Sequence, residues 1–223
     1  MESSQYYPCL DDPEYMRLFD LEMTYRTCSQ VPVYYLDIYL RDFLSPDQSR
    51  LLPTLLRAPV PFEEKLDAVA YVNSNCETLS PRAEIMRGLM RLVSNSTRVK
   101  VLSYGKCDNN TPMPGPKQEL IARHKFCVAM ENSITKDYVT EKLWDALIAG
   151  CVPIYLGPPN ARDFLPDPDA AIVYGAGSNI TTPEALMAEL ERLAGDRSAY
   201  ERMMAWKKKT RALHCNAALA LFA

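Results

Sequence analysis

The feature that most constrains the fold is an alternation of short apolar runs with amphipathic stretches between residues 66 and 195. Four of the apolar runs are expected to be buried strands, at residues 66–75, 99–104, 125–130 and 151–157. Three of the amphipathic stretches are expected to be helices, at residues 80–93, 137–150 and 181–195. Strands linked in this way pair in parallel, and strands that are apolar throughout have helices on both faces. The sequence therefore predicts an α/β fold built on a Rossmann-like open parallel sheet.

The ends of these helices carry local signals. Ser80 is the expected N-cap of the first helix, with Pro81 at its first helical position, and Gly150 is expected to end the second. A polar, proline-rich loop at 106–124 should lead into another helix, and a last helix is expected at 197–211.

Composition and motifs exclude several classes of protein. The chain has 25 basic and 28 acidic residues, so it lacks the basic excess of a nucleic-acid-binding protein. It contains no run of about 18 apolar residues that would span a bilayer, and MESSQYYPCLDDPEY is not a signal peptide. The seven cysteines form no C-x-x-C pair and the two histidines are far apart, so we expect no zinc site. Three N-x-S/T sequons, at Asn95, Asn109 and Asn179, are a weak indication of a secretory compartment.

Two cations occupy unusual positions on the expected helices. Arg82 lies in the first turn of one helix and Lys142 near the start of another. A helix N-terminus already carries positive partial charge, and it disfavours a cation by about 0.3–1 kcal/mol. Both residues should lie at the carboxyl edge of the sheet, where ligands of such folds bind. This placement indicates an anion between them, such as a phosphate or diphosphate. The alternative, a pair of solvated surface cations, stays open on spacing alone.

Other polar residues at the same edge have two interpretations each. Glu141 could accept hydrogen bonds from sugar hydroxyls, or it could be an ordinary first-turn carboxylate. Asn132 and Glu131 end a strand, where polar side chains often only form a turn. Tyr138 could stack on a base or ribose, or pack in the core. The PDPD segment at 166–169 is expected to be a plain loop rather than a metal-binding D-x-D motif.

A long block of the sequence resembles a known family. FCVAMENSITKDYVTEKLWDALIAGCVPIYLGPPNARDFLP looks like the signature block of the α1,3/α1,4-fucosyltransferase family, in its plant and lower-eukaryote branch. The segments that precede it in the family order are MESSQYYP with FDLEMTYRTCSQVPVYY, then VNSNCETLSPRAEIMRGLM, then VLSYGKCDNN. The resemblance covers about residues 1–175.

The resemblance implies a fold and a domain division. It implies the C-terminal half of a type B glycosyltransferase fold, with residues 66–212 as a Rossmann-like GDP-fucose-binding domain. Residues 1–65 are then the remnant of the N-terminal acceptor-side domain plus a linker, and residues 213–223 are a tail. Family members are usually anchored in the Golgi membrane and face its lumen, but their anchor, stem and complete first domain precede the segment at which this chain begins.

The resemblance also implies an activity, the transfer of L-fucose from GDP-fucose to an N-acetylglucosamine hydroxyl of a glycan, in an α1,3-type linkage with inversion. Arg82 and Lys142 would hold the diphosphate, Glu141 and Tyr138 the ribose and fucose, and Asn132 would line the donor site. Glu2 would be the general base. No cofactor is required, and a divalent metal is at most stimulatory, because the cations and a helix N-terminus can stabilise the leaving diphosphate.

Two other readings remain. One is a non-catalytic GDP-fucose-binding remnant, and the other is an α/β scaffold for protein interaction. The chain departs from the family at Ser4, where many members have proline, and in its C-terminal cysteine cluster, which is reduced to Cys215. Cys76 and Cys107 lie on neighbouring expected loops and could form a disulfide in an oxidising lumen.

Overall fold

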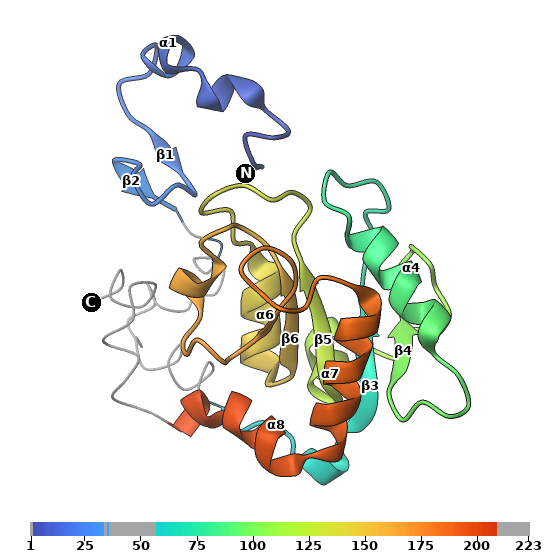
Figure 1. Ribbon diagram of the computed structural model, residues 1–223. Coiled ribbons are helices and arrows are strands. Elements are labelled where there is room, and N and C mark those ends of the chain that lie inside the picture. Colours follow the sequence, from blue (N-terminus) through green and yellow to red (C-terminus); the bar gives the residue numbers. More distant parts are fainter. Residues whose placement is uncertain (1, 34, 36–56, 209–223) are drawn as a thin grey trace.

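A computed structural model of the chain describes residues 2–33, 35 and 57–208. They contain a five-stranded parallel sheet with the strand order β4-β3-β5-β6-β7 (Figure 1). The strands are β3 (Leu66–Tyr71), β4 (Lys100–Ser103), β5 (His124–Met130), β6 (Val152–Leu156) and β7 (Ile172–Val173). The predicted fold class is confirmed. The fifth strand was not predicted, because it is two residues long and follows a proline-rich loop.

The strand order creates a crevice at one point of the sheet. β3 pairs with β4 on one side and with β5 on the other, so the direction in which the sheet grows reverses after β4. Connections that leave β3 and β5 therefore diverge to opposite sides at their carboxyl ends. Ligands of open α/β sheets bind in such a crevice.

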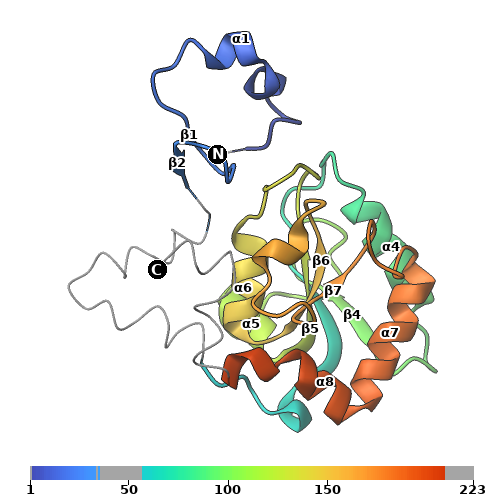
Figure 2. The same ribbon diagram turned by 60° about the vertical axis from the view of Figure 1, so that its left-hand side comes forward.

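Helices cover both faces of the sheet (Figure 2). One face carries α4 (Arg82–Leu92), α7 (Pro183–Gly195) and α8 (Arg197–Met203), and the other carries α5 (Lys117–Ala122) and α6 (Glu141–Ala149).

Strand residues alternate between the two cores. Val69 packs with Met86 and Leu89 of α4, whereas its neighbour Ala70 belongs to the core with Leu143 of α6. This alternation explains why the central strand residues are apolar on both faces of the sheet.

The observed helix ends confirm the predicted signal at Gly150 and correct the others. Pro81 precedes α4 rather than taking its first helical position, and the helix predicted from residue 137 begins only at Glu141, as α6. Gly150 ends α6 in the left-handed region, with φ of 73°, as predicted. Ser80 is not an N-cap, because α4 begins at Arg82 without a side-chain cap. The Ser80 hydroxyl donates instead to the Glu131 carbonyl oxygen, and its backbone N–H donates to Asn132 O at 2.8 Å. Ser80 therefore binds the chain after β5 instead of capping α4.

The C-terminal part differs from the expected single helix at 197–211. α8 ends at Met203, and a short 3-10 helix, η4 (Ala205–Lys208), follows. Residues 209–211, the predicted tail 213–223 with Cys215, and linker residues 44–56 lie outside the described residues. No helix in the described parts of the chain combines the length and hydrophobicity needed to cross a bilayer.

The N-terminal segment, residues 2–33, lies beyond the carboxyl edge of the sheet (blue in Figures 1 and 2). Its elements are η1 (Pro8–Asp11), α1 (Pro13–Met16) and the parallel pair β1 (Met23–Thr24) and β2 (Val31–Pro32). Two further 3-10 turns, η2 (Phe62–Glu64) and η3 (Ala161–Phe164), lie outside this segment.

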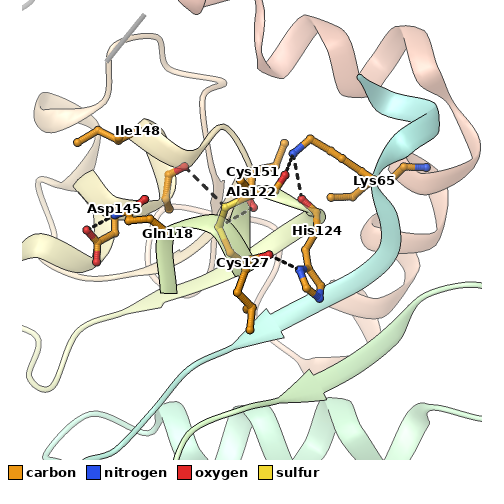
Figure 3. The surroundings of a disulfide bond; sticks show 12 residues. Lys65, Gln118, Ala122, His124, Cys127, Asp145, Ile148 and Cys151 are labelled. Atoms are coloured by element: carbon orange, nitrogen blue, oxygen red, sulfur yellow. Dashed lines mark hydrogen bonds between the residues drawn. A yellow bond between two sulfur atoms is a disulfide. The ribbon is translucent and has the colours of Figure 1, made fainter. Parts of the chain in front are cut away.

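Two disulfides join parts of the sheet domain. Cys76 and Cys107 link the loops after β3 and β4, as predicted. Cys127 of β5 is bonded to Cys151, immediately before β6, a pair that was not predicted (Figure 3). Cys9 and Cys28 are free and exposed.

Candidate functional site

A cavity of about 330 Å³ lies at the carboxyl ends of β3 and β5, in the crevice of the sheet. Four of the six predicted site residues line it, and these are Arg82, Asn132, Glu141 and Lys142. The two cations therefore converge on one cavity rather than pointing to opposite sides of the molecule. Larger cavities of about 600 and 530 Å³ contain none of the six predicted residues.

Arg82 is the most enclosed cation of the cavity, with only 3% of its surface exposed. Its Nη1 donates to Asn132 Oδ1 at 2.6 Å and to Met130 O at 3.2 Å, and its Nη2 donates to Asn73 Oδ1 at 2.6 Å and to Asn75 O at 2.8 Å. All four acceptors are neutral oxygens. Burial lowers the pKa of Arg82, but a guanidinium stays charged in proteins. Within the described residues no carboxylate pairs with Arg82, so its positive charge is available to an anion in the cavity.

Lys142 has acidic neighbours. Its Nζ lies 2.8 Å from Thr140 Oγ1, 3.1 Å from Glu141 Oε1 and 3.4 Å from Glu131 Oε2. Glu131 has no exposed surface, and its burial raises the pKa of its carboxyl group, against the opposing effect of Lys142. Burial also acts to raise the pKa of Glu141, but the charge of Lys142, the hydrogen bonds to the carboxylate and the charge of Lys117 together outweigh it and leave that pKa below its ordinary value. Lys142 is thus held between two carboxylates at the cavity wall.

The N-terminus of α6 is satisfied by the chain itself. Thr140 is the N-cap, and its hydroxyl accepts from the backbone N–H of Lys142. Glu131 accepts from both the backbone N–H of Thr140, at 2.8 Å, and its hydroxyl, at 2.6 Å. An anion in the cavity would therefore meet the side chains of Arg82 and Lys142 before these amides.

The residues of the cavity wall that were not predicted as site residues include Asn73, Asn75 and Lys117. Lys117 Nζ is 2.5 Å from Asp145 Oδ2, and burial lowers the pKa of Lys117. The lining thus holds three cations, Arg82, Lys117 and Lys142, and one carboxylate, Glu141. Lys117 and Lys142 already have acidic neighbours, so Arg82 is the cation of this set that lacks a carboxylate partner among the described residues.

The loop that carries Asn73 and Asn75 is fixed from behind. The backbone N–H of Cys107 donates to Asn73 O at 3.1 Å, and the Cys76–Cys107 disulfide links the same two loops. A side chain at Gly105 would place its Cβ 1.9 Å from Asn73 O, so only glycine permits this approach. The two asparagines are thereby held in position to bind Arg82.

Tyr138 and Glu2 do not line the cavity but lie together beside it. The Tyr138 hydroxyl donates to Glu2 Oε2 at 2.8 Å. The N-terminal segment also contacts the loop between β5 and α6 through Ser3 with Ser133 and through Gln5 with Ile134. The predicted acceptor-side residue thus lies against the loop that bears Asn132.

A buried carboxylate, Asp137, connects three segments near the same loop. Its Oδ2 accepts from the backbone and hydroxyl of Thr27, at 3.2 and 3.0 Å, and its Oδ1 accepts from Asn160 Nδ2 at 2.8 Å. Asp137 has a positive φ of 65°, a conformation that few non-glycine residues adopt. Among the described residues, no group of three or more histidine, cysteine or acidic side chains is arranged to hold a metal ion.

Comparison with known proteins identifies the family. A model described as glycosyltransferase family 10 (fucosyltransferase), C-terminal part, matches residues 62–220. The chain belongs to this fucosyltransferase family.

Relatives of this family 10 chain include two curated groups. A fucosyltransferase-like protein of Arabidopsis thaliana is 34% identical over 208 residues, which cover 93% of this chain and 36% of the relative. The GDP-fucose protein O-fucosyltransferase 3 of Homo sapiens is 34% identical over 171 residues, covering 69% of this chain and 34% of that protein. The corresponding protein of Danio rerio is 33% identical, with coverages of 76% and 37%. The chain spans about a third of the length of these relatives.

A solved structure has the same fold as this family 10 chain. The crystal structure of an alpha1,3-fucosyltransferase with GDP superposes with a TM-score of 0.54 at 18% identity, covering 80% of this chain and 48% of the other. This likeness confirms the Rossmann-like half of a type B glycosyltransferase fold.

Proposed function

We propose that the chain binds GDP-fucose in the cavity between Arg82 and Lys142 and takes part in fucosyl transfer to a hydroxyl acceptor. The observation that carries this proposal is the convergence of the predicted cations on one cavity, together with membership of the fucosyltransferase family. In support, GDP is present in the solved structure with the same fold.

The cations would act on the leaving group. When the bond between fucose C1 and the β-phosphate oxygen breaks, GDP keeps the electron pair and negative charge develops on the diphosphate. Arg82 is buried, fixed by four hydrogen bonds and free of a carboxylate partner among the described residues, so it would stabilise that charge without reorganisation. Lys142, and Lys117 beside it, would add to this effect. We propose on these grounds that no divalent metal is required and that a metal at most stimulates the reaction.

Glu2 would complete the reaction from the acceptor side. As the acceptor oxygen bonds to fucose C1 with inversion, its proton passes to the Glu2 carboxylate. Glu2 is half-buried, so its carboxylate is accessible to an acceptor while Tyr138 holds one of its oxygens.

Two acceptor classes follow from the sequence and the comparisons. The GDP-fucose protein O-fucosyltransferases at 33–34% identity favour a hydroxyl of a protein side chain. The resemblance in the signature block favours the N-acetylglucosamine hydroxyl of a glycan. We propose the protein acceptor first, because identities of 33–34% over 69–76% of this chain support it and the likeness at 18% identity bears only on the fold.

The alternative function is a module that binds GDP-fucose without transferring it. It is favoured by the composition of the cavity wall, which comes entirely from residues between Tyr71 and Lys142. Donor binding therefore needs no residue of the acceptor side. We also propose a Golgi-lumen location, which the two disulfides support because they persist in oxidising compartments.

Calorimetry with GDP, followed by a GDP-release assay, tests these proposals in turn. We expect the chain to bind GDP with and without EDTA, and to release GDP from GDP-fucose faster when an acceptor is added. Parallel reactions with a folded glycoprotein stripped of its glycans and with a GlcNAc-terminated glycan separate the two acceptor classes. No GDP binding would refute the donor site, and binding without acceptor-dependent release would leave the donor-binding module as the function.

A further inference from the structure

Tyr138 is enclosed by aromatic rings outside the donor cavity. Only 1% of its surface is exposed. Its ring makes edge contacts with Tyr25, at a centroid distance of 5.2 Å and 75°, and with Tyr35, at 6.1 Å and 86°. Such pairs prefer this edge-to-face geometry. The phenol is therefore locked in one orientation, and in that orientation its hydroxyl points to Glu2.

The phenols of Tyr35 and Tyr138 remain protonated and able to donate. Burial raises the pKa of Tyr35 to about 12, with Glu2 adding to the effect and a hydrogen bond with Tyr138 opposing it. Burial and the hydrogen bond to Glu2 likewise raise the pKa of Tyr138. At neutral pH the Tyr138 hydroxyl thus keeps its proton on its own oxygen and donates it in a hydrogen bond to the carboxylate.

Glu2 is fixed on one side only. Tyr138 binds its Oε2, while its Oε1 has no hydrogen-bond partner among the described residues. The next residues are anchored too, because Ser4 N–H donates to Tyr25 OH at 3.1 Å and Gln5 exchanges two hydrogen bonds of 3.1 Å with Ile134. A carboxylate with one oxygen held and the other free has the arrangement that a general base needs.

We propose that Tyr138 is a positioning residue for Glu2, which differs from the donor-binding role that the family resemblance implies. This inference rests on the proposed function, in which Glu2 is the base. The Tyr138 hydroxyl sets the rotamer of the Glu2 carboxylate and turns its free oxygen to the acceptor. It also attaches the base to the loop that carries Asn132, so the donor site and the base move as one unit.

The test compares Tyr138→Phe with Tyr155→Phe. Each change removes one buried phenol oxygen and keeps the ring, but the Tyr155 hydroxyl has no hydrogen-bond partner in the part of the chain that the structure describes. We expect Tyr138→Phe to lower kcat about tenfold, a part of the 10²–10⁴-fold effect of a positioned base. Its GDP-fucose Kd should stay within about twofold of wild type, as should every parameter of the control. A lower kcat with an unchanged Kd is the result that a merely structural role of Tyr138 would not give.

The outcomes separate the inference from the function on which it rests. If the wild type is active and Tyr138→Phe matches Tyr155→Phe in kcat, the positioning role is wrong. If Tyr138→Phe instead weakens GDP-fucose binding in proportion to its loss of rate, Tyr138 is a donor ligand and the inference is again overturned. A wild type that binds GDP-fucose but never releases GDP refutes the proposed transfer, and the positioning role with it. Melting curves and GDP binding establish that both variants are folded.

Discussion

Arg82 donates a hydrogen bond to Asn132 at 2.6 Å, so two residues predicted to hold the donor also hold each other. The same guanidinium binds Asn73 and Asn75. It therefore joins the loop after β3 to the loop after β5, across the crevice of the sheet. One cation here supports the cavity wall and supplies its charge.

Arg82→Lys should destabilise the fold as well as weaken donor binding. An ammonium cannot satisfy four acceptors spread over a planar fork, and buried acceptors left unpaired cost about 1–3 kcal/mol each. We expect the free energy of unfolding to fall by about 2–4 kcal/mol. Denaturant unfolding measures this, with the exposed Arg91→Lys of the same helix as control, which should change stability by less than about 0.5 kcal/mol. Equal stability of the two variants would contradict the structural role of Arg82.

Lys142→Ala should abolish most GDP binding while the fold stays intact. The loss of a charge-assisted contact worth about 1.5–3 kcal/mol corresponds to a Kd increase of about 10–100-fold. Glu131, deprived of its cation, should take up a proton rather than stay buried as an unpaired anion. Calorimetry with GDP measures the effect, and the exposed Lys106→Ala is the matched control. Unchanged GDP affinity in Lys142→Ala would rule out its diphosphate role.

Loss of the Cys76–Cys107 disulfide should loosen the cavity wall. The bond closes a loop with a sequence separation of 31 residues and lies directly behind Asn73 and Asn75. Replacing both cysteines by serine should reduce the free energy of unfolding by about 2–4 kcal/mol and weaken GDP binding. Denaturant unfolding and hydrogen exchange of residues 73–80 provide the readout. Cys9→Ser, which removes a free exposed thiol, should leave the free energy of unfolding and the GDP affinity unchanged. A double variant with wild-type GDP affinity would show that the loop holds its shape without the bond.

The stability of the chain should increase between pH 8 and about pH 9.5. Lys65 donates to Ala122 O at 2.5 Å and His124 O at 3.3 Å (Figure 3), and burial, with the charge of Lys207, lowers its pKa to about 8. Burial also lowers the pKa of Lys207 to about 8. Above pH 8 the unfolded chain therefore binds more protons than the folded chain, so the free energy of unfolding rises with pH.

Lys65→Met tests this pH dependence. Guanidinium unfolding at pH 8 and pH 9.5 should show a smaller rise for the variant than for wild type, because one of the two ammonium groups with a pKa of about 8 is gone. Lys106→Met, at an exposed position, should keep the wild-type rise. An identical rise in Lys65→Met and wild type would mean that Lys65 does not titrate in this range.

The sequence predicted the parts of the fold and site that depend on local pattern. Glu141 and Lys142 belong to a helix that ends at Gly150 as predicted, so their placement followed from that of α6, although the helix begins four residues later than predicted. Arg82 followed from α4 in the same way, although the helix begins without the predicted Ser80 cap.

The missed features depend on contacts that no local pattern encodes. Lys117 reaches the cavity from a six-residue helix after a proline-rich loop, where periodicity is too short to be informative. The pairing of Tyr138 with Glu2 joins residues 136 positions apart. The Cys127–Cys151 bond depends on the adjacency of β5 and β6, which becomes visible only once the sheet order is known.

The loop between β5 and α6 serves two partners at once, with Asn132 in the cavity wall and Ser133, Ile134, Asp137 and Tyr138 bound to the N-terminal segment. A substitution that improves the fit to one partner will disturb the other. In a saturation-mutagenesis screen for fucosyl transfer, these few positions should tolerate fewer replacements than either surface they connect, and gain-of-function variants should arise elsewhere.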